Sequence, residues 1–163
     1  MSRFLAGVVA GALAGASGAT ALNAVSFADM VLRGRPAGSS PKATVDAAAA
    51  KTGTEVPGEG EEAGNRASGA GQLAGLGVGV GVGVVAGVLR AHHVKIPKVL
   101  APFALGLGAM AISDSVMTAL GVADPRSWTA KSVTADALPH LAYGLVVPAA
   151  LHRMLDPRTP HAH

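Results

Sequence analysis

The residues of this sequence that could take part in chemistry are a few polar side chains set within long apolar stretches. Asp114 lies near the middle of one such stretch, between Ser113 and Ser115, and no Lys or Arg falls within that stretch to pair with it. His140 and Tyr143 are three residues apart, which places them on one side of a helix. Ionisable groups at membrane depth are costly and often mark ion paths or proton relays. Asp114 and His140 are therefore candidates for a proton or cation site.

A second polar set comprises Asn23, Ser26 and Asp29, which follow one another at three-residue spacing on a predicted helix. A simpler interpretation of both sets is that these groups hydrogen-bond across helices, each pair contributing on the order of 0.6 kcal/mol. We prefer this interpretation and keep the proton or cation site as the alternative.

Other kinds of chemistry find no support in the residue pattern. The chain has no cysteine and no HxxxH or ExxH spacing, so we expect no disulfide and no metal site. No GxSxG motif surrounds a serine, and we expect neither an enzyme nor a cofactor. The run from Gly81 to Ala86 fits a relaxed GxGxxA dinucleotide motif, but no strand precedes it and the next acidic residue, Asp114, is too distant.

The elements that must position these residues are apolar helices. Of the 163 residues, 50% are hydrophobic, 14% are charged and 3% are aromatic, and 22 are glycine. A helix needs about 20 apolar residues to cross a bilayer. We predict four spans, over about 4–32, 72–89, 99–122 and 138–154. The fourth is the weakest, because its apolar core is short and contains Pro139, His140 and Pro148.

The first span also resembles a signal peptide, since Arg3 precedes it and Ala19-Thr-Ala21 could be cleaved. An internal repeat argues against cleavage: Gly18-Ala-Thr-Ala-Leu-Asn23 is matched by Gly108-Ala-Met-Ala-Ile-Ser113. Because each repeat unit contains two spans, the units should be parallel. The expected fold is an all-α, four-helix transmembrane bundle made of two helical hairpins related by this degenerate repeat, in a single membrane domain over residues 1–163.

Residues 33–71 form the only sizeable polar segment. Ser40 and Pro41 are typical of a helix start, and we expect a short helix over 41–51. The acidic run from Pro57 to Glu62 cannot bury apolar surface, so we expect it to be a mobile loop.

The glycines have a regular spacing that indicates close helix packing. Residues four apart lie on one face of a helix, and small residues at that spacing let two helices approach closely in lipid. Two such grooves are predicted, one in the first span and one in the second, and we expect them to pack against each other. They consist of Gly7, Gly11 and Gly15, continued by Ala19, and of Gly75, Gly79, Gly83 and Gly87. The sequence leaves open whether the grooves meet within one chain or face a second copy or another membrane protein.

The net charge of +3 does not indicate a nucleic-acid partner, because the basic residues lie between the apolar blocks and not in one patch. Positive charges in short loops mark the cytoplasmic side. We therefore expect both termini and the 90–98 loop in the cytoplasm, with Trp128 near the opposite membrane interface. The charges counted for the cytoplasmic side are Arg3, Arg90, Lys95, Lys98, Arg153 and Arg158.

Several short stretches together resemble the uncharacterised small polytopic membrane proteins of high-GC actinobacteria. They are Gly34-Arg35-Pro36, Ser39-Ser40-Pro41, the acidic loop, Asp124-Pro125-Arg126-Ser-Trp128 and Pro139-His140-Leu-Ala-Tyr143-Gly144. The resemblance covers nearly the whole chain and implies a bacterial inner-membrane location without an assigned activity. The expected function is that of a structural or accessory membrane module, with a small proton or cation transporter or channel as the alternative.

Overall fold

The computed structural model describes residues 2–94 and 96–156, so Lys95 and Arg158 of the charge balance lie outside the described residues. This part of the chain is all α-helical, with one short 3₁₀ turn at Pro125–Ser127. The five helices are α1 (Arg3–Arg33), α2 (Ser40–Thr52), α3 (Gly60–Ala91), α4 (Ala101–Leu120) and α5 (Ala130–Leu155).

Local sequence explains where most helices begin and end. The hydroxyl of Ser2 accepts a hydrogen bond from the backbone N–H of Leu5 and caps α1. Gly34 ends α1 in the left-handed region, with φ of 59°, which a glycine adopts at little cost. Helix α2 covers the short helix expected over 41–51, with Pro41 in its first turn.

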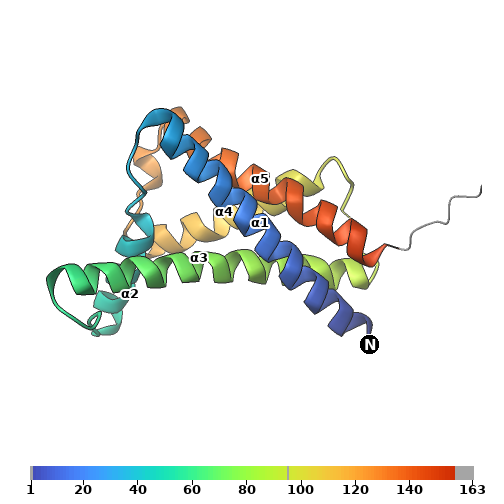
Figure 1. Ribbon diagram of the computed structural model, residues 1–163, viewed down its shortest axis with the longest axis horizontal. Coiled ribbons are helices and arrows are strands. Elements are labelled where there is room, and N and C mark those ends of the chain that lie inside the picture. The colour runs from blue at the N-terminus through green and yellow to red at the C-terminus, as the bar shows by residue number, and fades with distance from the viewer. Residues whose placement is uncertain (1, 95, 157–163) are drawn as a thin grey trace, which may run out of the picture.

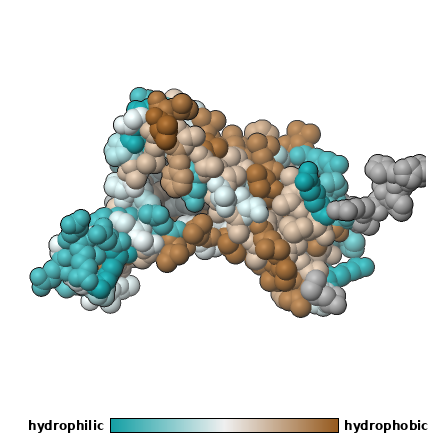
Figure 2. All heavy atoms as spheres, in the orientation of Figure 1, coloured by the Kyte–Doolittle hydropathy of each residue, from teal (hydrophilic) through white to brown (hydrophobic). Residues whose placement is uncertain are grey.

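Three of the helices are long and apolar enough to cross a membrane, namely α1, α3 and α4. Figure 2 shows the corresponding distribution, with hydrophobic atoms gathered over the middle of the molecule and hydrophilic atoms near its two ends. The N-terminal part of α3 and the neighbouring α2 make up one hydrophilic end (Figures 1 and 2).

The helix that contains the fourth predicted span is longer than that span. Helix α5 begins at Ala130, not near Leu138, because Thr129 and Ser132 form a capping box there. The added turns carry Lys131 and Asp136, and α5 is not among the helices that are apolar enough to count as spans. Pro139 and Pro148 both lie inside the helix without ending it.

The predicted acidic loop requires correction. Helix α3 begins at Gly60 and not near Gln72, so Glu61 and Glu62 belong to its first turn. Carboxylates are favourable there because the N-terminus of a helix carries partial positive charge. Glu62 also pairs with Arg66 one turn later, at 2.6 Å. These charge interactions explain why Glu61 and Glu62 are helical although they bury no apolar surface.

The helices pack unevenly. Helix α1 contacts α3 and α5, α5 contacts α4, and α2 lies against α3, whereas α3 and α4 make few contacts with each other. In Figure 1, α1 and α3 cross and then diverge toward the end of the molecule where α2 lies. At that end the Lys51 ammonium donates to the carbonyl of Ala119, which joins α2 to the end of α4.

Backbone, not large side chains, fills the crossing of α1 and α3. A methyl group added at Gly11 would lie 2.5 Å from the carbonyl oxygen of Gly83, and one added at Gly87 would lie 2.3 Å from that of Gly7. Gly15 and Gly79 make a similar approach one turn further along, where a methyl group on Gly15 would lie 2.6 Å from the Gly79 oxygen. No side chain larger than hydrogen fits here without moving the helices apart.

Gly75 lies outside this contact. A methyl group added there would meet nothing within 4 Å, because α1 and α3 have already diverged at that level. Other glycines make close contacts that the four-residue spacing did not identify. A methyl group on Gly144 of α5 would lie 2.0 Å from the Pro102 carbonyl of α4, and one on Gly71 of α3 would lie 2.2 Å from the Pro41 carbonyl of α2.

Candidate functional site

The divergence of α1 and α3 opens a cavity of about 430 Å³, which we call the vestibule. Its walls come from all five α-helices and from the segment between α1 and α2. The polar side chains that line it are Asn23, Ser26, Arg35, Gln72, Ser113, Asp136, His140 and Tyr143. Five of the predicted polar residues are therefore brought together from three different helices: Asn23, Ser26, Ser113, His140 and Tyr143.

Tyr143 forms the inner end of the vestibule. Its side chain is fully buried, and its hydroxyl donates a hydrogen bond of 2.6 Å to the carbonyl oxygen of Gly79. The ring packs so closely on α1 that a methyl group on Gly18 would lie 2.7 Å from Cδ2. Tyr143 thus contacts α1 and α3 at the level where the two helices separate, and it closes the vestibule there.

His140 lies one turn closer to the mouth of the vestibule, and its partner is Asp136. The Nδ1 atom of His140 is 2.9 Å from the backbone carbonyl oxygen of Asp136 and 3.4 Å from its Oδ1. A proton assigned to Nδ1 is donated to these acceptors, which leaves Nε2 for a group in the vestibule. The His140 side chain is 12% exposed and that of Asp136 is 44% exposed, so the carboxylate is the more accessible of the two.

Asp136 is a site residue that sequence reasoning missed. The span predicted over 138–154 does not include Asp136. The Thr129-x-x-Ser132 capping box is the local signal that places Asp136 inside the helix, four residues before His140.

Asp114 does not share the vestibule with His140. It lines a separate open depression with Ser115, Thr118 and Trp128. Within the described part of the chain, no hydrogen bond or ion pair joins Asp114 to His140. Consecutive residues of a helix point about 100° apart, which explains why Ser113 faces the vestibule and Asp114 does not.

Asp29 lies at the end of α1 in a pair of arginine contacts. Its carboxylate is 2.6 Å from Nε of Arg33 and also accepts from Nε of Arg35. These contacts hold the segment after α1 against the helix. Asp29 therefore has a structural partner, whereas no hydrogen bond of the Asn23 or Ser113 side chain is present among the described residues.

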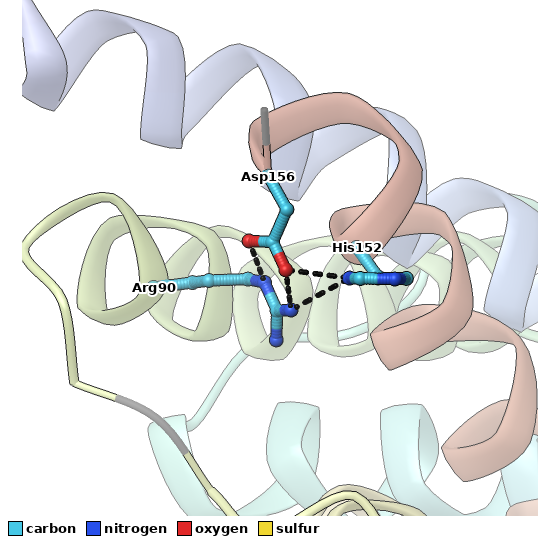
Figure 3. A network of polar contacts seen from close by, with 3 residues as sticks. All are labelled: Arg90, His152 and Asp156. Carbon is cyan, nitrogen blue, oxygen red and sulfur yellow. Dashed lines mark hydrogen bonds and ion pairs between the residues drawn. The ribbon is translucent and has the colours of Figure 1, made fainter. Parts of the chain in front are cut away.

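A second polar cluster lies at the opposite end of the bundle, where α3 and α5 end (Figure 3). Arg90 donates from Nε to Oδ1 of Asp156 at 3.1 Å and from Nη2 to Oδ2 at 2.6 Å. His152 places Nδ1 2.5 Å from the same Oδ2, so it donates there. The Arg90 guanidinium, followed by His152, lowers the pKa of Asp156 to about 2.

In the part of the chain that the structure describes, no three His, Cys, Asp or Glu side chains are placed to hold a metal ion. Comparison with known proteins finds no matching family model, no matching curated protein and no matching solved structure.

Proposed function

We propose that this chain is a structural or accessory membrane protein in which four helices, α1, α3, α4 and α5, cross the bilayer as a bundle. The observation that carries this proposal is the backbone-to-backbone approach of α1 and α3 at Gly11 and Gly83, between two helices that are apolar enough to span. Hydrophobic burial cannot drive helices together in lipid, and close approach between small residues is the usual substitute.

The placement of α5 as a fourth span rests on its length and on its two faces. Its 26 residues extend over about 39 Å, against a hydrocarbon thickness of about 30 Å. Asp136 and His140 line the vestibule, whereas Leu138 and Leu145 are 56% and 60% exposed. A helix with polar groups toward the bundle and leucines toward lipid can cross a membrane even where its mean composition is modest.

The remaining parts of the proposal are topological. The bacterial inner membrane is the location that the sequence resemblance implies, and the basic residues of the short loops put both termini in the cytoplasm. The two hairpins follow the degenerate repeat, in which Asn23 and Ser113 are equivalent. Both of these residues line the vestibule, which supports that equivalence.

The glycine contacts within the chain limit the surfaces on which a partner protein could bind. Gly7, Gly11 and Gly15 are occupied by contacts within the chain, so these positions are not free to face a second copy. A partner protein would bind another face of the bundle. The module function therefore depends on correct internal packing more than on any single polar side chain.

A second function is favoured by one specific observation, the Asp136–His140 pair in the vestibule. We propose proton or cation binding there as the alternative activity, because a carboxylate and an imidazole in a polar cavity can exchange protons between about pH 5 and 8. We place this alternative site at Asp136 with His140 because both line the vestibule, whereas Asp114 lines a separate depression.

One set of variants distinguishes the two functions. In proteoliposomes, an ion-conducting protein should lose proton or cation flux on Asp136→Asn and His140→Gln, while Asp114→Asn, outside the vestibule, should retain it. For an accessory module, those three variants should support growth of a deletion strain as wild type does, and Gly83→Ala should not. Flux lost equally in Asp114→Asn and Asp136→Asn would contradict the assignment of the vestibule.

A further inference from the structure

The few contacts between α3 and α4 leave a groove between them, with a volume of about 550 Å³. Its walls include Val82 and Ala86 of α3 and Ala104 and Gly108 of α4, and Leu151 of α5 lies at its base. Among the described residues that line the groove, Arg90 is the only charged one, and it lies at one end. The groove is thus an apolar channel with a single cationic end.

The length of the groove matches one leaflet of a bilayer. Along α4 the lining residues run from Ala101 to Ile112, and along α3 from Val78 to Arg90. At a rise of 1.5 Å per residue these stretches are about 17 and 18 Å long. Half of the hydrocarbon thickness is about 15 Å, which is the depth that one acyl chain covers.

The end of the groove at Arg90 is basic. Arg3 contacts His93 at 3.1 Å, Lys98 precedes α4, and Arg153 lies in the last turn of α5, so these basic residues belong to the end of the bundle where Arg90 lies. Asp156 is the one carboxylate that the described residues place against Arg90. It takes Nε and Nη2, while Nη1 carries no interaction with the residues drawn in Figure 3. Asp156 therefore orients the guanidinium and leaves one of its nitrogens for an anion.

We propose that this groove binds one acyl chain of an anionic phospholipid, with the lipid phosphate on Arg90. The leaflet length of the groove accounts for the chain, and the excess of positive charge at its end accounts for the headgroup. Basic pockets between membrane helices bind anionic headgroups, and the attraction of one basic residue to an anionic membrane surface corresponds to about fivefold in affinity. This inference rests on the proposed insertion of the helices in a bilayer.

The experiment uses delipidated full-length protein in detergent and native mass spectrometry. Phosphatidylglycerol and phosphatidylcholine with identical acyl chains are titrated separately. We expect one phosphatidylglycerol per chain, bound at a concentration at least about fivefold below that for phosphatidylcholine. Arg90→Gln should reduce the difference between the two lipids by about fivefold, and Arg126→Gln, at the opposite end of the bundle, should not change it.

A groove-filling variant keeps the test independent of the Arg90–Asp156 pair. Ala104→Trp should abolish the first lipid-binding event, whereas Ala111→Trp, on the other side of α4, should leave it unchanged. Equal binding by Ala104→Trp and wild type would overturn the proposal, as would equal affinity of wild type for the two lipids. A dimer that Ala104→Trp dissociates would also overturn it, because a second copy would then occupy the groove.

Failure of the underlying membrane assignment gives a different result. If the wild-type protein stays in solution after cell lysis without detergent, the proposed function fails and not the lipid site alone. Recovery only in the detergent-extracted membrane fraction, with no lipid preference, would reject the lipid site and leave the membrane assignment in place.

Discussion

Among single residues, Tyr143 of α5 joins three helices, because it touches α1 at Gly18 and donates to α3 at Gly79. A buried hydrogen bond contributes about 1 kcal/mol net. We expect Tyr143→Phe to lower the free energy of unfolding by about that amount in mixed micelles, measured by reversible denaturation with a charged detergent. Ser17→Ala removes a hydroxyl that bonds only within α1 and should change it by less than about 0.5 kcal/mol. Equal effects would contradict the role of the phenol.

Asp156 gives a prediction about pH. Its pKa is lowered to about 2 in the folded protein, so the Arg90–Asp156 pair stabilises the fold fully above about pH 4, the ordinary value of an aspartate. This contribution is lost as the pH falls through about 2, because the unfolded chain takes up the proton first. The ¹³C shift of the Asp156 carboxyl should therefore titrate near 2 in wild type and distinctly higher in Arg90→Gln. An unchanged midpoint in Arg90→Gln would contradict this account.

At the scale of helices, we expect replacement of glycine by alanine in α3 to lower stability where α3 crosses α1, and to maintain or raise it two residues away. A methyl group on Gly83 would lie 2.5 Å from the Gly11 oxygen, and overpacking of this kind costs about 1–3 kcal/mol. At Gly81 a methyl group meets nothing within 4 Å, and alanine has a helix propensity about 1 kcal/mol better than glycine.

The measurement is unfolding of Gly83→Ala and Gly81→Ala in the same micelles. Gly83→Ala should be destabilised, and Gly81→Ala should be unchanged or more stable. Gly75→Ala should behave like Gly81→Ala, although the four-residue spacing grouped Gly75 with Gly83. If Gly83→Ala and Gly81→Ala have the same stability, the close approach of the two helices is not what holds this pair together.

For the whole molecule, the number of crossings decides on which side each end lies. Because the chain contains no cysteine, single cysteines can be labelled with a membrane-impermeant maleimide. With four spans, Ser2→Cys and Arg153→Cys should react from the cytoplasmic side, and Glu55→Cys from the opposite side. Ser2 precedes α1, Glu55 lies between α2 and α3, and Arg153 lies in the last turn of α5, so opposite sides for Glu55 and Arg153 require an odd number of crossings by α3, α4 and α5. Reaction of Arg153→Cys on the same side as Glu55→Cys would contradict the four-span arrangement.

The sequence by itself determined the features that depend on neighbouring residues. Apolar length predicted α1 and α4 to within a few residues, and Ser40 with Pro41 predicted the start of α2, because helix formation and membrane insertion are decided within one segment. Four-residue spacing placed Gly11 and Gly83 on faces suited to close packing for the same reason. Helices α3 and α5 extend beyond the predicted spans because polar turns continue them, and hydrophobicity gives no signal for those turns.

Only the tertiary structure decided which groups meet. Gly75 shares the spacing of Gly83 but not its contact, because two straight helices that cross must diverge on either side of the crossing. Asp114 and His140 both lie within apolar stretches of the sequence, yet they face different cavities. The rotation of α4 about its own axis directs Ser113, and not Asp114, toward the vestibule. The crossing angle and the rotation of each helix depend on the packing of all the helices at once, so residue spacing along the sequence cannot predict them.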